Sequence, residues 1–508
     1  MTNSYYEGSK MFLWLANLTG INVDQVNFLI SQFVALALAS LFRTVLHPSK
    51  TNSATRHGFG LIVGLIIGYF CFGTQAIHLA GLPALCYIVI RTQSPEIMQR
   101  MVLAVALLYL SAIHLHRQMY DYGSYSLDVT GLSISGPLMV ITQKVTSLAF
   151  NIHDGLTRKE VDLSKNQKYY AVRRMPTALE YFSYALNFPA LMAGPAIFYR
   201  DYMDFIDGKS FMTVTSNGTI DKKNQDKTVV IEPSPIKVCF QKAILSLICA
   251  FIYIKFTPMF PIASLKDDDF ENKSLTYKFV YLHMVTMLVR FKYYFAWLLS
   301  DAICNNAGLG FNGYDEHGAF KWNRFSNINI LKFEFGSNLR ESIEAWNMGT
   351  NKWLRMVVYE RVQNYPIVLT YALSALWHGF YPGYYLTFAN GAIFTIAART
   401  MRRTVRDYFT GNAELKLIYD IATCILTRLV MAYITFTFVL LDFWPSVRLY
   451  LHMHLCLHIV AVIAILIVPR VIRRAVPGDS SQLSAKGRIA HALRKASPLT
   501  NSVSNHHD

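Results

Sequence analysis

The chain has 508 residues, of which 53% are hydrophobic and only 16% are charged. A soluble protein of this size needs a largely polar surface, so this composition indicates an integral membrane protein. Lysine and arginine outnumber aspartate and glutamate by 48 to 32, but the basic residues are dispersed among apolar runs, which argues against a nucleic-acid-binding protein.

Apolar runs long enough to cross about 30 Å of hydrocarbon recur along the chain. They predict an all-α, polytopic membrane domain over residues 1–470 with about eleven transmembrane helices. The apolar runs from which these spans are predicted lie near 28–46, 59–72, 74–90, 101–116, 131–151, 178–199, 236–257, 275–304, 361–377, 383–398, 416–441 and 445–469. Several contain Gly or Pro breaks, which membranes tolerate only where protein or a cavity satisfies the backbone. We therefore expect a polar interior.

Basic residues gather in the connections and in the tail, and the positive-inside rule places most of these in the cytosol. Arg470 directly follows the last span, and residues 471–508 are rich in Ser, Ala, Lys and Arg. This composition predicts a disordered cytosolic tail. The loop 200–235 also holds the sequon Asn217-Gly218-Thr219, which is used only on the lumenal side, so both orientations of this loop stay open.

The amphipathic segment from Trp346 to Arg355 is the first candidate for chemistry. Trp346 and Trp353 are apolar, whereas Lys352 and Arg355 are basic. One interpretation is a helix that lies in the membrane interface. The other is that the two basic residues hold the phosphates of a nucleotide-bearing substrate while Asn347 points inward.

The span that ends near residue 377 carries the second candidate. It closes on Ser374-Ala375-Leu376-Trp377-His378-Gly379, so a histidine follows directly on an apolar run. A polar side chain at membrane depth is costly, which favours a functional role for His378. The alternative is an interfacial histidine in an aromatic belt with Trp377 and Tyr381.

The remaining histidines give weaker signals. His454 and His458 are four residues apart and could share a helix face as metal ligands, but no acidic third ligand lies nearby in the sequence. His114 and His116 are two residues apart and point away from each other on a helix, so we do not expect them to act as a pair. No GxGxxG, P-loop or HExxH motif occurs. The sequence therefore predicts no metal site and no bound cofactor.

Two strings, WNMGTNKWLR at 346–355 and SALWHGFYPGYYLTF at 374–388, resemble the signature of the membrane-bound O-acyltransferase family. The upstream LGFNGYDE at 309–316 and the stretch from Asn187 to Pro195 are similar to its lysophospholipid acyltransferase branch, whose members act on lysophosphatidylethanolamine, lysophosphatidylserine and lysophosphatidylcholine. The resemblance covers most of 20–470 and departs at the termini and in the 205–235 loop.

The resemblance implies that His378 is the catalytic histidine and Asn347 the active-site asparagine. A desolvated imidazole stays neutral, so His378 could accept the proton of an acceptor hydroxyl. The amide of Asn347 could donate a hydrogen bond to the thioester oxyanion, or it could orient the imidazole. The residues expected to bind substrate are Trp346, Lys352, Arg355, Trp377 and Tyr381.

The implied activity is acyl transfer from acyl-CoA, as a co-substrate, to a lysophospholipid in the endoplasmic reticulum membrane. We expect acyl-CoA to enter from the cytosol and the lysophospholipid to enter from the bilayer, with no obligate protein partner. One alternative keeps the fold but takes a sterol, diacylglycerol or peptide acceptor. The other is a transporter that uses broken helices for conduction. The sequence leaves head-group preference, acyl-chain preference, sn-position and oligomeric state open.

Overall fold

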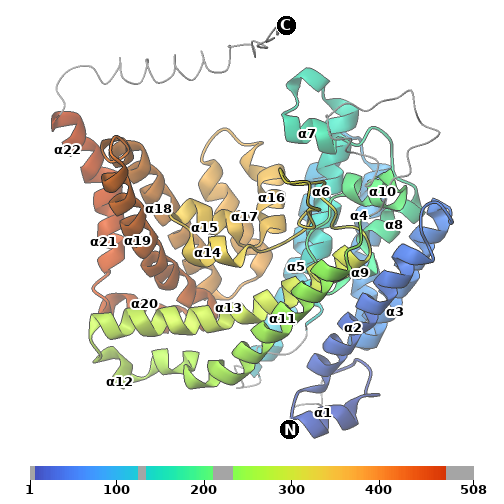
Figure 1. Cartoon of the computed structure of the whole chain (residues 1–508), viewed down its shortest axis with the longest axis horizontal. Helices are drawn as coiled ribbons and strands as arrows, with labels where there is room; N and C mark the ends of the chain where they lie inside the picture. The colour runs from blue at the N-terminus through green and yellow to red at the C-terminus, as the bar shows by residue number, and fades with distance from the viewer. Residues whose placement is uncertain (1–5, 124–132, 210–232, 476–508) are drawn as a thin grey trace, which may run out of the picture.

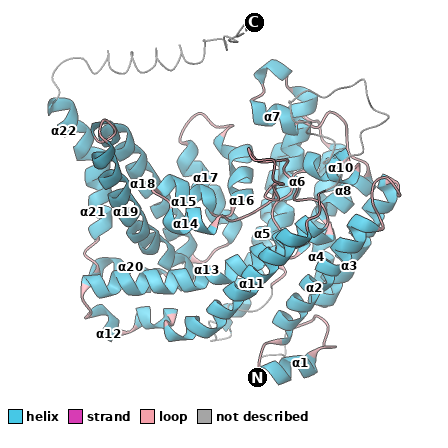
Figure 2. Ribbon diagram, viewed as in Figure 1, coloured by secondary structure: helices cyan, strands magenta, loops and turns pink. Residues whose placement is uncertain are grey.

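The computed structural model describes residues 6–123, 133–209 and 233–475, and Figure 2 shows them as helices joined by loops. Within these ranges the only β pairing is an isolated bridge between Tyr314 and Phe320. The prediction of an all-α protein is therefore confirmed for the described residues. The sequon at Asn217 lies outside them, as does the predicted tail after Ala475.

The amino-terminal half of the chain forms a group of long helices that includes the two blue helices at the right of Figure 1. These are α2 (Val23–Thr44), α3 (Ser53–Phe72), α4 (Ile77–Thr92), α5 (Met98–Gly123) and α6 (Ser135–Thr157). They share one apolar core, in which Phe42 and Leu148 are fully buried. Apolar residues of α3 such as Ile66 and Tyr69 are 62% and 67% exposed, as expected of side chains that face lipid.

The carboxyl-terminal half is built around the long helix α13 (Leu275–Asn306), which packs against α2 and the helices α11 and α19. Its other long helices are α11 (Ile236–Phe256), α17 (Pro366–His378), α18 (Pro382–Val405) and α19 (Ala413–Leu440). A second apolar core, in which Tyr294 and Tyr433 are fully buried, lies between them. The two halves meet where α13 packs against α2 and where α17 packs against α5.

Five helical segments of the described residues are long and apolar enough to cross a membrane, judged by length and composition. They are Val23–Thr44, Ser53–Thr92, Met98–Met119, Ile236–Lys266 and Ala413–Leu440, and a sixth forms if the bent pair Phe443–His452 and Cys456–Ile472 is counted as one span. The chain is thus a multi-pass membrane protein, but the predicted number of eleven spans is not confirmed.

The region predicted as one span at 178–199 is instead a set of short buried helices. These are α8 (Ala178–Ala185), α9 (Phe188–Leu191) and the start of α10 (Tyr199–Ile206). Pro189 and Pro195 interrupt the run, since proline lacks the backbone N–H and clashes with the preceding turn. Residues such as Tyr184 and Phe188 are buried against α3 and α6. The apolar character here belongs to a protein core, not to a lipid-facing helix.

The region predicted as a span at 445–469 is also broken. It consists of α20 (Phe443–His452), α21 (Cys456–Val462), a π-helical turn (Ile463–Ile467) and α22 (Val468–Ala475), and it bends by 79°. His454 and Leu455 have positive φ angles of 55° and 48° at the bend, which no continuous right-handed helix allows. The last helix continues past the predicted domain boundary at residue 470.

Between α13 and α17 the chain forms only short helices. They are α14 (Ile330–Phe335), α15 (Leu339–Ala345), α16 (Met348–Leu354) and a π-helical turn (Arg355–Tyr359). The side chains of Asn329 and Asn338 cap α14 and α15 by accepting from backbone N–H groups, which satisfies donors that a short helix leaves unpaired. This segment carries Asn347, and α17 carries His378.

Candidate active site

His378 is the last residue of α17 and sits among aromatic rings. Its ring centroid lies 4.6 Å from that of Trp377, 4.8 Å from that of Phe388 and 5.3 Å from that of Phe438. Gly379 follows with φ 116°, an angle that favours glycine and that ends the helix here. The sequence therefore places the imidazole at a helix end in surroundings of low polarity.

One hydrogen bond determines the tautomer of His378. Its Nδ1 lies 2.7 Å from the backbone oxygen of Ser374, one turn earlier in the helix. A carbonyl oxygen can only accept, so Nδ1 carries the hydrogen and donates it. In the neutral ring the lone pair is then on Nε2. His378 thus presents the atom that a general base needs.

Asn347 is the residue directly before α16, and it adopts a left-handed backbone conformation with φ 43° and ψ 56°. Asparagine tolerates this region better than most residues do. Its Oδ1 accepts a hydrogen bond from Nδ2 of Asn327 at 3.0 Å. Because the oxygen is engaged, the amide nitrogen is the end that remains to donate to a substrate.

The helices that bear Asn347 and His378 are fixed to the same neighbours. Gln143 of α6 donates to the Thr350 hydroxyl at 2.8 Å, and the indole N–H of Trp353 donates to the Thr146 hydroxyl at 2.9 Å. The ring of Trp353 lies 5.7 Å from that of Trp377, the residue before His378. These contacts hold α16 and α17 side by side.

In the described part of the chain no hydrogen bond joins the side chains of His378 and Asn347. The imidazole is already oriented by the Ser374 carbonyl. Of the two roles that the sequence left open for Asn347, donation to a substrate oxygen therefore fits the geometry better than orientation of the histidine.

The two expected phosphate contacts are exposed residues at the carboxyl end of α16, with Lys352 in its last turn and Arg355 directly after it. Lys352 donates to the Tyr170 hydroxyl at 2.5 Å, and its ammonium lies 4.6 Å from the centre of the Tyr170 ring. Desolvation lowers the pKa of Lys352, against the attraction of Asp201, whereas burial and the Asp201 carboxylate raise the pKa of Tyr170. Arg355 pairs with Glu360 at 3.3 Å.

The three aromatic residues expected to bind substrate occupy different places. Trp346 packs against α13 and α14, with ring centroids 4.9 Å from Trp297 and 4.9 Å from Phe333. Trp377 is 4% exposed, and its indole N–H donates to the Met139 carbonyl at 3.0 Å. The ring of Tyr381 lies 5.8 Å from that of Tyr384, and the ring of Tyr384 lies 5.8 Å from that of His378. Only Trp377 contacts His378 directly, and a substrate role for these residues stays a prediction.

Two residues of the site gave no usable signal in the sequence. Asn327 forms a hydrogen bond with Asn347, which is 20 residues later in the sequence. His114 forms one with the backbone carbonyl of Trp377, which is 263 residues later. The Nε2 of His114 lies 3.1 Å from the Trp377 carbonyl, to which it donates. Its ring fills the space beside Gly379, where an added Cβ would come within 3.2 Å. Neither contact follows from local spacing, so only the tertiary structure reveals them.

The hypothesis that His454 and His458 share a helix face is wrong, because His454 lies in the bend before α21. The His458 ring forms two hydrogen bonds, one between Nδ1 and the Tyr433 hydroxyl at 2.9 Å and one between Nε2 and Oδ1 of Asn390 at 3.0 Å. Both nitrogens are thus occupied by protein groups. Among the residues that the structure describes, no group of three or more His, Cys, Asp or Glu side chains could hold a metal ion.

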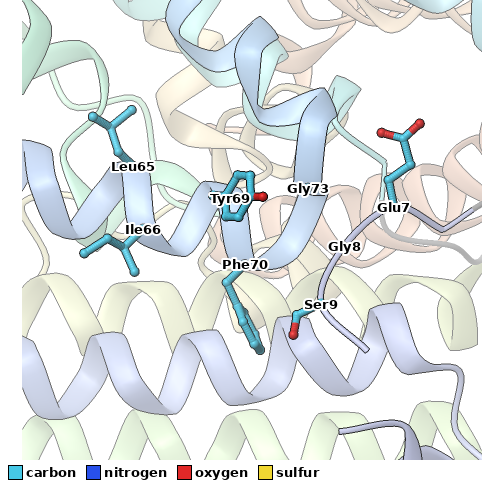
Figure 3. A pocket seen from close by; sticks show the side chains of 8 residues that line it. All are labelled: Glu7, Gly8, Ser9, Leu65, Ile66, Tyr69, Phe70 and Gly73. Carbon is cyan, nitrogen blue, oxygen red and sulfur yellow. The ribbon is translucent and has the colours of Figure 1, made fainter. Parts of the chain in front are cut away.

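A surface hollow lies far along the chain from these residues. Figure 3 shows it between the segment Glu7 to Ser9 and the end of α3, where Leu65, Ile66, Tyr69, Phe70 and Gly73 line it. Neither His378 nor Asn347 contributes to it. The hollow is therefore separate from the candidate active site.

Residues 98–441 match the family model described as MBOAT, the membrane-bound O-acyltransferase family. The chain is 57% identical over 474 residues to lysophospholipid acyltransferase 6 of Drosophila melanogaster, a match that covers 93% of this chain but 65% of that protein. It is 40% identical over 488 residues to membrane-bound glycerophospholipid O-acyltransferase 2 of Homo sapiens, with 95% and 92% covered. It is 29% identical over 479 residues to lysophospholipid acyltransferase of Schizosaccharomyces pombe, with 91% and 89% covered. The chain belongs to the membrane-bound O-acyltransferase family.

Proposed function

We propose that this chain is a lysophospholipid acyltransferase, which moves a fatty acyl group from acyl-CoA to the free hydroxyl of a lysophospholipid. The proposal is supported by family membership and by relatives named for this activity in fly and yeast. The observation that carries the mechanism is the hydrogen bond from His378 Nδ1 to the Ser374 carbonyl. It leaves Nε2 as the proton acceptor that O-acylation requires.

In the proposed reaction, Nε2 of His378 takes the proton of the acceptor hydroxyl while the hydroxyl oxygen attacks the thioester carbonyl carbon. The amide nitrogen of Asn347 donates to the oxyanion that forms. The intermediate then collapses with cleavage of the carbon–sulfur bond, and the imidazolium can return its proton to the CoA thiolate. Thiols have a pKa of about 8.5, so the leaving group needs no metal and no strong acid.

The exposed face of α16 is the proposed entry for acyl-CoA. Lys352 and Arg355 lie on it, and Lys352 reaches α7 (Lys165–Tyr170). Figure 1 shows α7 and α22 on the same side of the molecule, toward the top of the view. The basic residues near α22 put that side in the cytosol by the positive-inside rule. We place the enzyme in the endoplasmic reticulum membrane, where it would act without a bound cofactor.

The direct test is CoA release by detergent-purified protein that is given one labelled acyl-CoA and one acceptor at a time. The lysophospholipids are lysophosphatidylethanolamine, lysophosphatidylserine and lysophosphatidylcholine, and the contrasting acceptors are a sterol, a diacylglycerol and a peptide. We expect labelled diacyl phospholipid to form together with free CoA. Acylation of a contrasting acceptor alone would refute the proposed acceptor class, and no acyl transfer at all would refute the enzyme assignment.

A further inference from the structure

The turn that carries Asn347 is bound at three points by one buried residue, Asn327. Its Nδ2 donates to Oδ1 of Asn347 at 3.0 Å, its Oδ1 accepts from the backbone N–H of Gly349 at 2.9 Å, and its backbone carbonyl accepts from the N–H of Met348 at 2.9 Å. Asn327 is only 5% exposed. Water is therefore a poor substitute for these contacts.

The direction of these bonds fixes the orientation of both amides. A backbone N–H can only donate, so the group of Asn327 that faces Gly349 must be its oxygen. The Asn327 nitrogen then faces Asn347, and the group of Asn347 that meets it must also be an oxygen. Without this chain of bonds, the Asn347 amide could turn by half a rotation and exchange its oxygen and nitrogen at little cost, because the two ends have the same shape.

We infer that Asn327 is a positioning residue that determines which end of the Asn347 amide meets the substrate. The inference rests on the proposed function, in which the nitrogen of Asn347 donates to the thioester oxyanion. Close packing keeps Asn327 in place. A Cβ added to Gly349 would lie 3.2 Å from Asn327 Oδ1 and 3.1 Å from the backbone nitrogen of Ala196, so this small residue lets the turn approach Asn327 closely.

The variant that tests this role is Asn327→Asp. A carboxylate of the same shape still accepts from Gly349, but it cannot donate to Asn347. The Asn347 amide should then turn to donate to the new carboxylate, which presents its oxygen to the substrate. Misplaced catalytic groups cost about 10²-fold in rate, so we expect kcat to fall by that order while the KM for acyl-CoA changes little.

A double variant separates positioning from a general structural role. Asn327→Asp combined with Asn347→Ala should be no slower than Asn347→Ala alone, because no amide remains to be oriented. Asn327→Ala removes both side-chain bonds without adding a charge, and it should lower kcat in the same way. The matched control is Asn312→Asp, since exposed Asn312 donates to Asn323 Oδ1 at 2.9 Å in the same kind of amide pair.

The outcomes distinguish this inference from the proposed function. Absence of acyl transfer by the unaltered protein would refute the function itself. If Asn347→Ala is impaired but monodisperse Asn327→Asp and Asn327→Ala turn over normally, only the positioning role is overturned. Losses that multiply in the double variant would also overturn it, because they would show that Asn327 acts independently of Asn347.

Discussion

His378 and Asn347, the two residues proposed to act in acyl transfer, are held in place by different kinds of interaction. His378 lies at the end of a regular helix, among aromatic rings, and its bond goes to a backbone carbonyl of its own helix. Asn347 lies between short helices, and the side chain of Asn327, 20 residues earlier in the chain, holds it. A long helix orients its residues by its own backbone, whereas a segment without one depends on tertiary polar contacts.

Buried ion pairs supply much of the support for the Asn347 segment. Arg290 of α13 donates to both carboxylate oxygens of Glu334 at 2.8 and 2.9 Å, and the Tyr294 hydroxyl donates to Glu334 at 2.5 Å. Arg428 of α19 donates to the Phe333 carbonyl. Because both charges of the Arg290–Glu334 pair are largely buried, the loss of one partner should be costly.

A second buried cluster anchors the loop that leads to Asn327. Lys242 of α11 and Ser326 each lie 2.6 Å from the same carboxylate oxygen of Asp301. Lys242 also donates to the Trp322 carbonyl at 2.8 Å. The loop is thus fixed to α11 and α13 just before Asn327. The histidine side of the site thus depends on packing, and the asparagine side on charge and hydrogen bonds.

The largest effect is expected at the histidine itself. His378→Ala removes the only base proposed for the acceptor hydroxyl, and general-base catalysis is worth about 10²- to 10⁴-fold, so acyl transfer should fall by that order. The surrounding rings remain, so the protein should elute unchanged from size exclusion. The matched control is the exposed His317→Ala. A folded His378→Ala enzyme with normal turnover would favour the interfacial histidine of an aromatic belt.

The next effect is expected at Asn347. Asn347→Ala should lower kcat by about 10²- to 10³-fold if the amide stabilises the oxyanion, and by less if it only orients His378. Asn347→Asp keeps a side chain that tolerates the left-handed backbone, but it removes the donor, and it should be at least as impaired. In a double variant with His378→Ala the losses should be far from multiplicative. Fully multiplicative losses would mean that the two residues work in separate steps.

Breaking the Arg290–Glu334 ion pair between α13 and α14 should reduce stability. Glu334→Gln leaves Arg290 without its charge partner, and loss of one member of a buried pair costs about 3 to 5 kcal/mol. Thermal unfolding in detergent would measure the change. The control is Glu344→Gln, whose pair with Arg340 has side chains that are 49% and 68% exposed and should contribute about 1 kcal/mol or less. Equal losses in both variants would mean that the buried Arg290–Glu334 pair contributes no more to stability than an exposed pair does, and would contradict its proposed role in supporting the asparagine side of the site.

The smallest effect is expected on the surface of α16. Neutralising Lys352 and Arg355 together should raise the KM for acyl-CoA more than it lowers kcat, because the lost contacts are to the phosphates and not to the reacting atoms. Lys255→Ala combined with Lys273→Ala removes the same charge from exposed sites elsewhere. A double variant that kept its KM but lost kcat would reassign Lys352 and Arg355 to the support of α16.

The sequence identified the class of protein and predicted its two candidate active-site residues. Composition alone indicates a membrane protein, and the strings around Asn347 and His378 are specific enough to indicate the family, which the comparisons confirm. Apolar periodicity also located the uninterrupted helices, such as 236–257 and 416–441, to within a few residues. Such features depend on residues that are close together in the chain, so the sequence alone reveals them.

Tertiary structure decided how these residues are oriented and which apolar runs form long helices. Hydropathy does not distinguish a segment that faces lipid from one that is buried in a protein core. It therefore predicts a span at 178–199, although the helices there are short and buried. The contacts of Asn327 with Asn347 and of His114 with the Trp377 carbonyl join residues that no local pattern links. Hydrogen bonds depend on distance and direction in space, and these are fixed only when the chain has folded.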